Sequence, residues 1–550
     1  MKYSIFSLLL ITLFLGACEY LDYNEKSYLL KDDVYSDIDR VRSALTGIYT
    51  ELPSGFTQVG EAMLASATDE AVFAKDANPV HKFHNGAWSA AQPLDSKWNL
   101  FAPIRRANRF LIEVDKYDYE EYRWDKDPTY ETLMEEIERY KMEARALRAY
   151  FYLELAKRYG DIPLITTVLD ENEANQLPRT PFNEVIEFIV QECEEVAPHL
   201  PKSYEGERLG ETGRITQGAV MAIKARALLY AASPLHNSEG SVSAWQEAAE
   251  AAYAIIDSGD YSLNPNYSSV FNNYSSNNSE LILERRHSAS NNFERINFPV
   301  GYIGGTSGNC PTQNLVDAYE MADTGLDIDE EGSGFDPFNP FEGRDPRLEA
   351  SILYNGATWK GQTIEAYQGG ANGEPLRYAT PTGYYLKKYV IEGINLEPPN
   401  VTQVEHTWVL FRYAEVLLNY AEAMNEAYGP EDAAGMGMTA RAAVNEVRQR
   451  AGMPDFPAGM TKEEFRSKLR NERRVELAFE GHRFWDVRRW MIGDQTTDIY
   501  GTTIGFNPFG GYTYEKTLVE EREFNDNMNL FPIPQTEIYK NPYLEQNPGW

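Results

Sequence analysis

The sequence predicts a mainly α-helical fold in which tetratricopeptide-like helix pairs form a scaffold that carries a large, loop-rich insert with short strands. Three observations support this prediction. Long stretches repeat their apolar residues with helical periodicity. Helices far apart in the chain share one alanine pattern, "ARAL", at Ala144 and again at Ala225. Between them and the C-terminal helices lies a region rich in Gly, Asn, Pro and aromatic residues, which has no such period.

The helices are expected where apolar residues recur every three or four positions. Alanines on one helix face let a neighbouring helix approach closely, while aromatic residues fill the remaining gaps, as in tetratricopeptide pairs. "YAEVLLNYAEAM", from Tyr413, has the same spacing. The two "ARAL" copies are not separated by a multiple of about 34 residues, so insertions interrupt the repeat. The predicted helices are Tyr35–Leu52, Pro93–Val114, Pro128–Tyr159, Phe182–Ala197, Thr216–Ala232, Ala244–Ser258, Trp408–Ala427, Ala440–Ala451, Lys462–Phe479 and Arg483–Met491.

The insert separates two helical regions. Residues 18–261 are expected to form an N-terminal helical region, and residues 406–550 a C-terminal helical region that packs with it. Between them, residues 262–405 contain loop-like stretches such as "YIGGTSGNCPTQ" and short strand-like stretches such as "GYYLKKYVIEG". Loops on a rigid helical base are a common place for a binding face.

The first residues predict export and lipid anchoring. "MKYSIFSLLLITLFLGACEYLD" has a basic start, an apolar run and small residues before Cys18. The run is too short to span a bilayer comfortably and is typical of a signal peptide. Residues 1–17 are therefore predicted to be a lipoprotein signal peptide, and Cys18 the acylated residue of a bacterial lipobox. The alternative is an ordinary secretory signal with an incidental cysteine.

The composition excludes some classes of partner and ligand site. The net charge is −33, which opposes binding to a phosphate backbone, so no nucleic acid is expected as a partner. The three cysteines, Cys18, Cys193 and Cys310, have no spacing typical of zinc ligands, and a disulfide between the last two stays open. Aromatic residues make up 13% of the chain, and rings suit flat stacking surfaces as well as cores.

Over nearly the whole chain after Cys18, the sequence resembles the SusD/RagB family of outer-membrane nutrient-binding lipoproteins. The resemblance rests on blocks in the family's order: "WNLFAPIRRANRFL", "RALRAYFYLELAKRYGDIPLI", "GRITQGAVMAIKARALLYAASP", "PTQNLVDAYEMADTG", "GRDPRL", "LFRYAEVLLNYAEAMNE", "VNEVRQRAGMP" and "LFPIPQTEIYKNPYLEQNPGW". It implies a lipid-anchored protein on the extracellular face of a Gram-negative outer membrane. Such a protein captures oligosaccharide for a SusC-like, TonB-dependent transporter, has no catalytic centre and needs no cofactor. Some members bind peptides instead.

"ERRVELAFEGHRFWDVRRW", from Glu472 to Trp490, raises the question of an active site at His482. No second histidine lies nearby, as a zinc hydrolase would require. Arginines and acidic residues at helical spacing predict ion pairs between packed helices, with Gly481 between two helices. This stretch is therefore predicted to be framework, and no catalytic residue is expected.

No metal site is predicted either, although one acidic loop contains part of a calcium-binding pattern. In "DTGLDIDEEGSGF", Asp327, Asp329 and Glu331 alternate as in a calcium loop, and they are the weak candidates for metal ligands. Phe338 stands at the twelfth position, where such a loop needs a bidentate glutamate.

Aromatic and amide side chains in loop-like segments are the expected ligand contacts. Sugar C–H groups stack on electron-rich rings, while polar side chains hold the hydroxyls. The candidates are Phe83, Trp88, Tyr274, Tyr302, Trp359, Tyr367, Asn78, Asn309 and Gln313.

The expected function is glycan capture at the cell surface and delivery to a transporter, without catalysis. Alternatives are the same fold binding peptide, a surface glycoside hydrolase, and a helical adaptor whose only partner is protein.

Overall fold

The computed structural model describes residues 29–272, 278–507 and 511–550. Cys18 and the predicted signal peptide, and also Tyr274, lie outside this range. The helices are α2 Lys31–Tyr35, α3 Ile38–Tyr49, α4 Phe101–Val114, α5 Tyr130–Tyr159, α6 Glu171–Ala174, α7 Phe182–Val196, α8 Gln217–Ala232, α9 Val242–Asp257, α10 Ser269–Asn272, α11 Asn292–Asn297, α12 Gln313–Asp317, α13 Pro346–Ser351, α14 Tyr413–Tyr428, α15 Ala440–Ala451, α16 Lys462–Glu476, α17 His482–Arg489 and α18 Gln535–Lys540.

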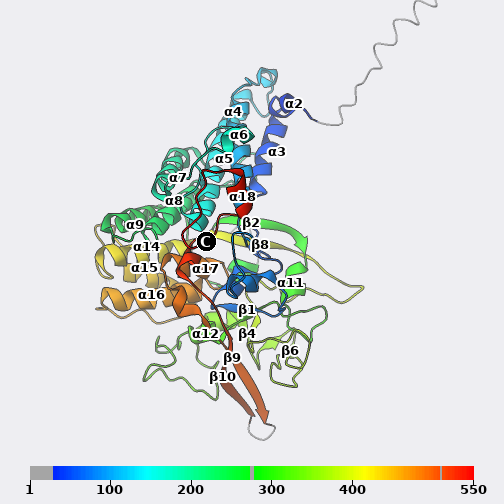
Figure 1. Cartoon of the computed structure of the whole chain (residues 1–550), viewed down its shortest axis with the longest axis vertical. Helices are drawn as coiled ribbons and strands as arrows, with labels where there is room; N and C mark the ends of the chain where they lie inside the picture. The colour runs from blue at the N-terminus through cyan, green and yellow to red at the C-terminus, as the bar shows by residue number, and fades with distance from the viewer. Residues whose placement is uncertain (1–28, 273–277, 508–510) are drawn as a thin grey trace, which may run out of the picture.

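The longer helices form the predicted scaffold. They pack in a row that runs from α3, α4 and α5 through α7, α8 and α9 to α14, and both α15 and α16 pack on α14. Figure 1 shows α7, α8, α9, α14, α15 and α16 stacked in this order down one side of the molecule. The row joins N-terminal and C-terminal helices directly, since α9 packs on α14. The mainly helical prediction is therefore confirmed.

Two predicted helices begin too early in the sequence-based assignment. Residues 93–100 precede α4 and are not α-helical, because Asp95 and Lys97 adopt left-handed backbone angles of φ 43° and 50°. Trp408–Arg412 belongs to a strand, and α14 begins only at Tyr413. The β-branched and aromatic residues of "HTWVLFR" suit a strand, and tertiary pairing decides the matter.

The strands form two-stranded antiparallel sheets. Their bounds are β1 Ala71–Phe73, β2 Leu281–Ser290, β3 Asn309–Pro311, β4 Ile352–Leu353, β5 Thr358–Trp359, β6 Gln362–Thr363, β7 Tyr385–Leu386, β8 Val404–Arg412, β9 Asp498–Asn507 and β10 Gly511–Glu521. β1 pairs with β3, so the N-terminal region contributes to the insert. β2 pairs with β8, which leads into α14. The boundaries predicted at residues 261 and 405 stay predictions, and strand pairs cross both.

The β9–β10 hairpin is the main feature that the helical prediction for residues 406–550 missed. It projects from the end of the molecule opposite α2 (Figure 1). Its second strand, "GYTYEKTLVEE", alternates exposed and half-buried residues, as expected for a ribbon with one partly covered face. This alternation is a strand signal that the sequence itself carries.

The polar stretch around His482 is framework, as predicted. Burial holds the pKa of His482 well below its ordinary value, so the ring is neutral. Asp486 accepts hydrogen bonds from Arg473 and Arg489 at 2.8 Å each. Gly481, at φ +82°, is the N-cap residue immediately before α17 and lies in the break that follows α16.

Two further findings concern anchoring and redox state. Cys193 and Cys310 are buried and free. Within the described residues, no helix combines the length and apolar character needed to cross a membrane.

Candidate ligand-binding face

Four of the expected ligand contacts are buried. Trp88 is 4% exposed and packs edge-on against Phe531 and Trp550, each with ring centroids 4.8 Å away. Phe83 lies in the same cluster, and Trp359 is 1% exposed beside Phe298. The structure gives these rings no free face on which a sugar could stack, and core packing accounts for them.

Asn309 is the fourth buried candidate, and its amide is engaged internally. It is fully buried, accepting hydrogen bonds from the Met63 backbone at 3.0 Å and from the Ser66 hydroxyl at 2.8 Å. Its amide nitrogen donates to Asn297 at 2.9 Å. This side chain joins the β3 strand to the segment before β1, which is a structural role.

The other two polar candidates also have partners within the protein. Asn78 accepts from the Val80 backbone N–H at 2.9 Å and so caps the short helix that follows. Gln313 accepts from the Tyr384 hydroxyl at 2.6 Å and donates to Asp317 at 2.6 Å. Both are partly exposed, so a ligand reaches them only by competing with these bonds.

Tyr302 and Tyr367 remain as half-buried rings on the insert. The Tyr302 hydroxyl donates to the Trp359 carbonyl at 3.0 Å, and burial raises the pKa of Tyr302. The Tyr367 hydroxyl interacts with the Glu365 side chain of its own loop. The Tyr367 ring stacks on Phe506 of β9, with ring centroids 4.9 Å apart and ring planes at 29°.

Tyr367, Phe506 and Tyr512 form one continuous surface, which we call the aromatic face. Phe506 and Tyr512 are directly opposite each other across the β9–β10 ladder, with ring centroids 5.3 Å apart. The ring centroids of Tyr367 and Tyr512 are 5.6 Å apart. Phe506 is 50% exposed, and the other two rings are half-buried. Three rings from two distant segments thus present a partly open apolar surface at the end of the hairpin.

Further rings lie beside the aromatic face. Tyr514 follows Tyr512 by two residues and therefore points to the same side of β10. Its ring contacts Phe341 edge-on, with ring centroids 5.4 Å apart, and the Phe341 ring stacks on Tyr354 with centroids 4.1 Å apart. The row of rings ties the hairpin to the insert and limits how far the aromatic face can shift.

The loop that carries Tyr367 is held in one conformation. Asn372 donates to the Val300 carbonyl at 2.7 Å and accepts from the Glu365 backbone N–H at 3.0 Å. At Gly373, a Cβ would lie 2.0 Å from the Tyr367 carbonyl oxygen, so only glycine fits there. A fixed loop lowers the entropy that a ligand must remove on binding.

A cation lies beside a second ring of the same loop. Lys75 Nζ is 5.7 Å from the centre of the Tyr378 ring, and Tyr378 has a left-handed backbone, φ 67°. Left-handed backbone at a tyrosine is costly and tends to persist at ligand contacts. Lys75 also pairs with Glu61 at 2.6 Å, so its charge is already balanced.

Of the rings in the aromatic face, the sequence predicted only Tyr367. It did not indicate Phe506 and Tyr512, nor Tyr378 beside the aromatic face. The first two lie in a region assigned to helices, although the alternation of β10 could have located them.

The acidic loop does not gather a metal site. Lys468 forms ion pairs with Asp327 at 2.9 Å and with Glu330 at 2.8 Å. In the part of the chain that the structure describes, no three His, Cys, Asp or Glu side chains come together in a group that could hold a metal ion. The weak candidates Asp327, Asp329 and Glu331 are thus not brought together as ligands.

Comparison with known proteins decides the family. Residues 266–550 match the SusD family. The chain belongs to the SusD family. Residues 19–229 match a second, SusD-like family, described as starch-binding and associating with the outer membrane. The resemblance predicted from sequence blocks is therefore confirmed.

Several SusD-like proteins are similar over most of the chain. SusD-like protein P2 of Formosa agariphila is 28% identical over 439 residues, which are 74% of this chain and 75% of the relative. A SusD-like protein of Bacteroides fragilis superposes with a TM-score of 0.78 at 29% identity, covering 95% of this chain and 99% of the other. A SusD-like carbohydrate-binding protein of the same species gives 0.76 at 26% identity, covering 93% and 100%. The glycan-binding proteins of the SusD family are not catalysts, which agrees with the predicted absence of enzymatic activity.

Proposed function

We propose that this SusD-family protein captures a neutral oligosaccharide on the aromatic face and passes it to a TonB-dependent outer-membrane transporter. The observation that carries the proposal is the aromatic face itself: Tyr367, Phe506 and Tyr512 in mutual contact and partly open to solvent. Sugar rings present C–H groups on their faces, which pack on the electron-rich faces of aromatic rings. The carbohydrate-binding relative from Bacteroides fragilis supports a glycan as the ligand.

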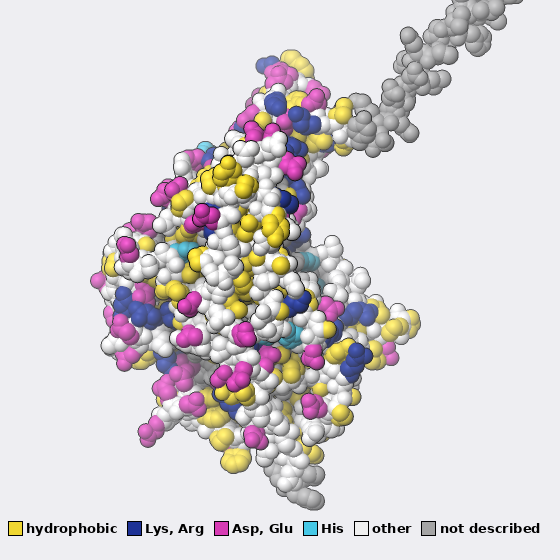
Figure 2. All heavy atoms as spheres, viewed as in Figure 1, with side chains coloured by type: hydrophobic (Ala, Val, Ile, Leu, Met, Phe, Trp, Pro, Cys, Tyr) yellow, Lys and Arg dark blue, Asp and Glu magenta, His cyan; other side chains and the backbone are white. Residues whose placement is uncertain are grey.

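The charge of the protein favours a neutral glycan over an anionic one. The net charge is −33, and acidic side chains are spread over the face shown in Figure 2. A polymer of uronic acids or sulfated sugars would meet repulsion at long range. A neutral chain would not.

The location follows from the predicted anchor. Acylation at Cys18 would leave ten residues before Leu29, where the described chain begins, and an extended segment of this length spans at most about 35 Å. The protein would then stay close to the outer membrane and to a SusC-like transporter embedded in it. The match of residues 19–229 to an outer-membrane-associated family supports this placement.

A glycan array followed by calorimetry tests the proposal. We expect a neutral oligosaccharide to bind the protein without being cleaved, and Tyr367→Ala, Phe506→Ala and Tyr512→Ala each to weaken binding at least tenfold. Tyr539→Ala is the matched control, because Tyr539 is 80% exposed on α18 and lies outside the aromatic face. Unchanged affinity in all three variants would refute the site, while selective binding of peptides, or release of sugar products, would refute the function.

A further inference from the structure

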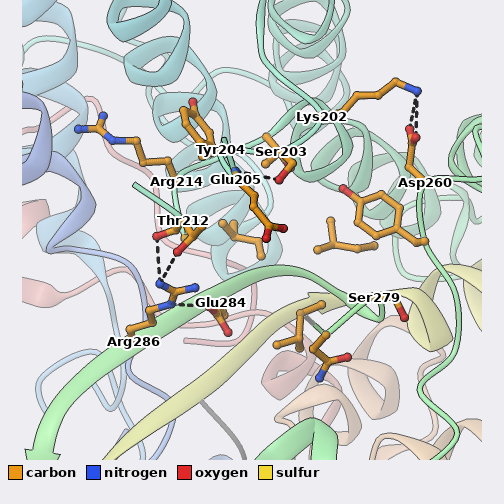
Figure 3. Close-up of a pocket in the computed structure, with 17 residues that line it drawn as sticks. Lys202, Ser203, Tyr204, Glu205, Thr212, Arg214, Asp260, Ser279, Glu284 and Arg286 are labelled. Carbon is orange, nitrogen blue, oxygen red and sulfur yellow. Dashed lines mark hydrogen bonds and ion pairs between the residues drawn. The ribbon is translucent and has the colours of Figure 1, made fainter. Parts of the chain in front are cut away.

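A polar cavity lies where the helical scaffold meets β2, on a part of the molecule that the aromatic face does not include. Its volume is about 360 Å³. One wall is the connection between α7 and α8, a second is the turn after α9, and the floor is the start of β2 (Figure 3). Pockets of a few hundred Å³ hold small ligands.

The cavity borders the edge of β2. Side chains of successive strand residues point to opposite faces, yet Leu281, Ile282, Leu283 and Glu284 all line the cavity. The register of β2 against β8 shifts between Leu281 and Leu283 and again between Leu283 and Glu284, and these irregularities let successive residues reach the same space. In the described sheets, β2 pairs only with β8, so its other edge can offer backbone N–H and C=O groups to the cavity. Leucine and isoleucine side chains add an apolar surface.

Charges at the two ends of the cavity are already paired. Lys202 pairs with Asp260 at 2.9 Å, and Arg286 donates to Glu284 at 2.5 Å and to the Thr212 hydroxyl at 2.9 Å. Arg214 turns away from the cavity and pairs with the buried Glu143 at 2.9 Å (Figure 3).

Glu205 lies between these pairs and reaches toward the middle of the cavity (Figure 3). Its carboxylate has no hydrogen-bond or ion-pair partner among the described residues, whereas its backbone N–H donates to Ser203 at 3.0 Å. The Ser203 and Ser279 hydroxyls lie on the same lining. The cavity therefore combines hydroxyl groups, one carboxylate acceptor and an apolar floor.

We infer that this cavity is a second saccharide site, which takes a neutral unit of one or two sugar rings. The inference rests on the proposed function, because it supposes that the ligand is a glycan. A sugar hydroxyl both donates and accepts, so it suits a lining that mixes Ser, Glu and backbone groups. The apolar floor matches the C–H face of a sugar, and the Glu205 carboxylate excludes uronic acids by repulsion.

The second site is separate from the first. β2 lies in the middle of the molecule, while the β9–β10 hairpin projects at one end (Figure 1). Two sites on one protein raise the apparent affinity for a chain long enough to reach both, without any new contact. Long glycans should therefore bind more tightly than short ones with the same terminal sugars.

Saturation-transfer NMR with named disaccharides tests the site. The probes are maltose, cellobiose, laminaribiose and xylobiose, with digalacturonate as the anionic control and a tripeptide mixture as the alternative ligand. The protein carries Tyr367→Ala, Phe506→Ala and Tyr512→Ala together, so that the aromatic face does not contribute. We expect at least one neutral disaccharide to give a signal and digalacturonate to give none.

Two cavity variants and a control show whether the saturation-transfer signal comes from ligand bound in the cavity. Ser279→Trp fills the cavity from an exposed position, and Glu205→Ala removes the central acceptor; both should lower the signal at least fivefold. Ser288→Trp, exposed on the same strand but outside the cavity, should leave it unchanged.

The outcomes separate the two proposals. No signal from any neutral disaccharide, a signal that survives both cavity variants, or a signal only from tripeptides would overturn the second site. If the wild-type protein still binds a longer glycan through the aromatic face, the proposed function stands without it. If the wild-type protein binds no glycan at all, both proposals fail.

Discussion

Glu476 is the central acceptor of a buried ion-pair network, and Glu476→Gln is the sharpest test of what holds the insert to the helices. Its carboxylate accepts from Arg347 at 2.9 Å, from Arg412 at 2.6 Å, and from Arg450. Glu476 and these arginines are at most 4% exposed. Arg347 belongs to α13 in the insert, Arg412 to β8 and Arg450 to α15. One carboxylate of α16 therefore joins three other elements.

The expected loss of folding stability depends on the acidic partners that each arginine keeps. After the substitution, Arg347 still has Asp345 and Glu472, and Arg412 still has Glu280 and Glu480. Removing one partner of a buried pair typically costs about 3–5 kcal/mol, because a charge is left without compensation. The remaining carboxylates place the expected loss near the lower end, at about 3 kcal/mol. That is a large part of a total stability of about 5–15 kcal/mol.

Urea denaturation at pH 7 measures the loss, and an unchanged slope would show that the folded state keeps its compactness. Glu537→Gln, which breaks the exposed pair with Lys540, is the control and should change nothing measurable. A loss below about 1 kcal/mol for Glu476→Gln would refute the reasoning, since the network would then contribute little.

The same pair of proteins gives a pH test. The surrounding arginines outweigh burial and hold the pKa of Glu476 well below its ordinary value. A carboxyl with a lowered folded-state pKa stabilises the fold at pH values above its unfolded pKa, near 4.3, and loses this contribution as the pH falls through the folded-state pKa. The stability difference between wild type and Glu476→Gln should therefore be full at pH 7 and shrink in strong acid.

Three further predictions use other parts of the molecule. Burial raises the pKa of Glu70 to about 8, and its carboxylate oxygens have no hydrogen-bond partner among the described residues. The folded protein thus binds a proton that the unfolded chain releases above its ordinary pKa near 4.3, so the contribution of Glu70 to stability should fall by on the order of 1.4 kcal/mol per pH unit up to pH 8. Glu70→Gln should remove this slope in a denaturation series, and an unchanged slope would contradict the assignment. Trp359→Ala should cost about 3–5 kcal/mol in the same assay while glycan affinity changes little, because the ring is buried; lost affinity with unchanged stability would mean that the ring contacts ligand. Millimolar Ca²⁺ or a chelator should leave the melting temperature unchanged, because Lys468 already occupies Asp327; stabilisation by Ca²⁺ would show that the acidic loop binds metal.

The scaffold could be predicted because its signal is local. Helices such as α8 and α15 agree with their predicted bounds to within a residue, since periodicity and caps are both encoded nearby. The start of α14 could not be predicted in the same way. Trp408–Arg412 has apolar residues that suit either state, and only the pairing of β8 with β2 makes it a strand.

The proposed ligand face was harder to predict because the exposure of a side chain is a tertiary property. Trp88 and Tyr367 are both aromatic residues in loop-like sequence, yet one is enclosed by Phe531 and Trp550 and the other is partly open. Nothing in the residues beside them distinguishes the two cases. Phe506 became a candidate only once the hairpin brought it against a loop more than a hundred residues earlier in the chain.

The network around Glu476 and the aromatic face depend on different interactions, and this separation has a physical consequence. The base of the insert is fixed by buried ion pairs, whose removal costs folding energy. The Tyr367 loop is fixed by a few hydrogen bonds, chiefly those of Asn372, and by contact with the hairpin. Changes of ring type at Tyr367, Phe506 or Tyr512 therefore leave the network intact and should alter ligand preference at little cost in stability. Such a division lets one helical scaffold carry binding faces for different glycans.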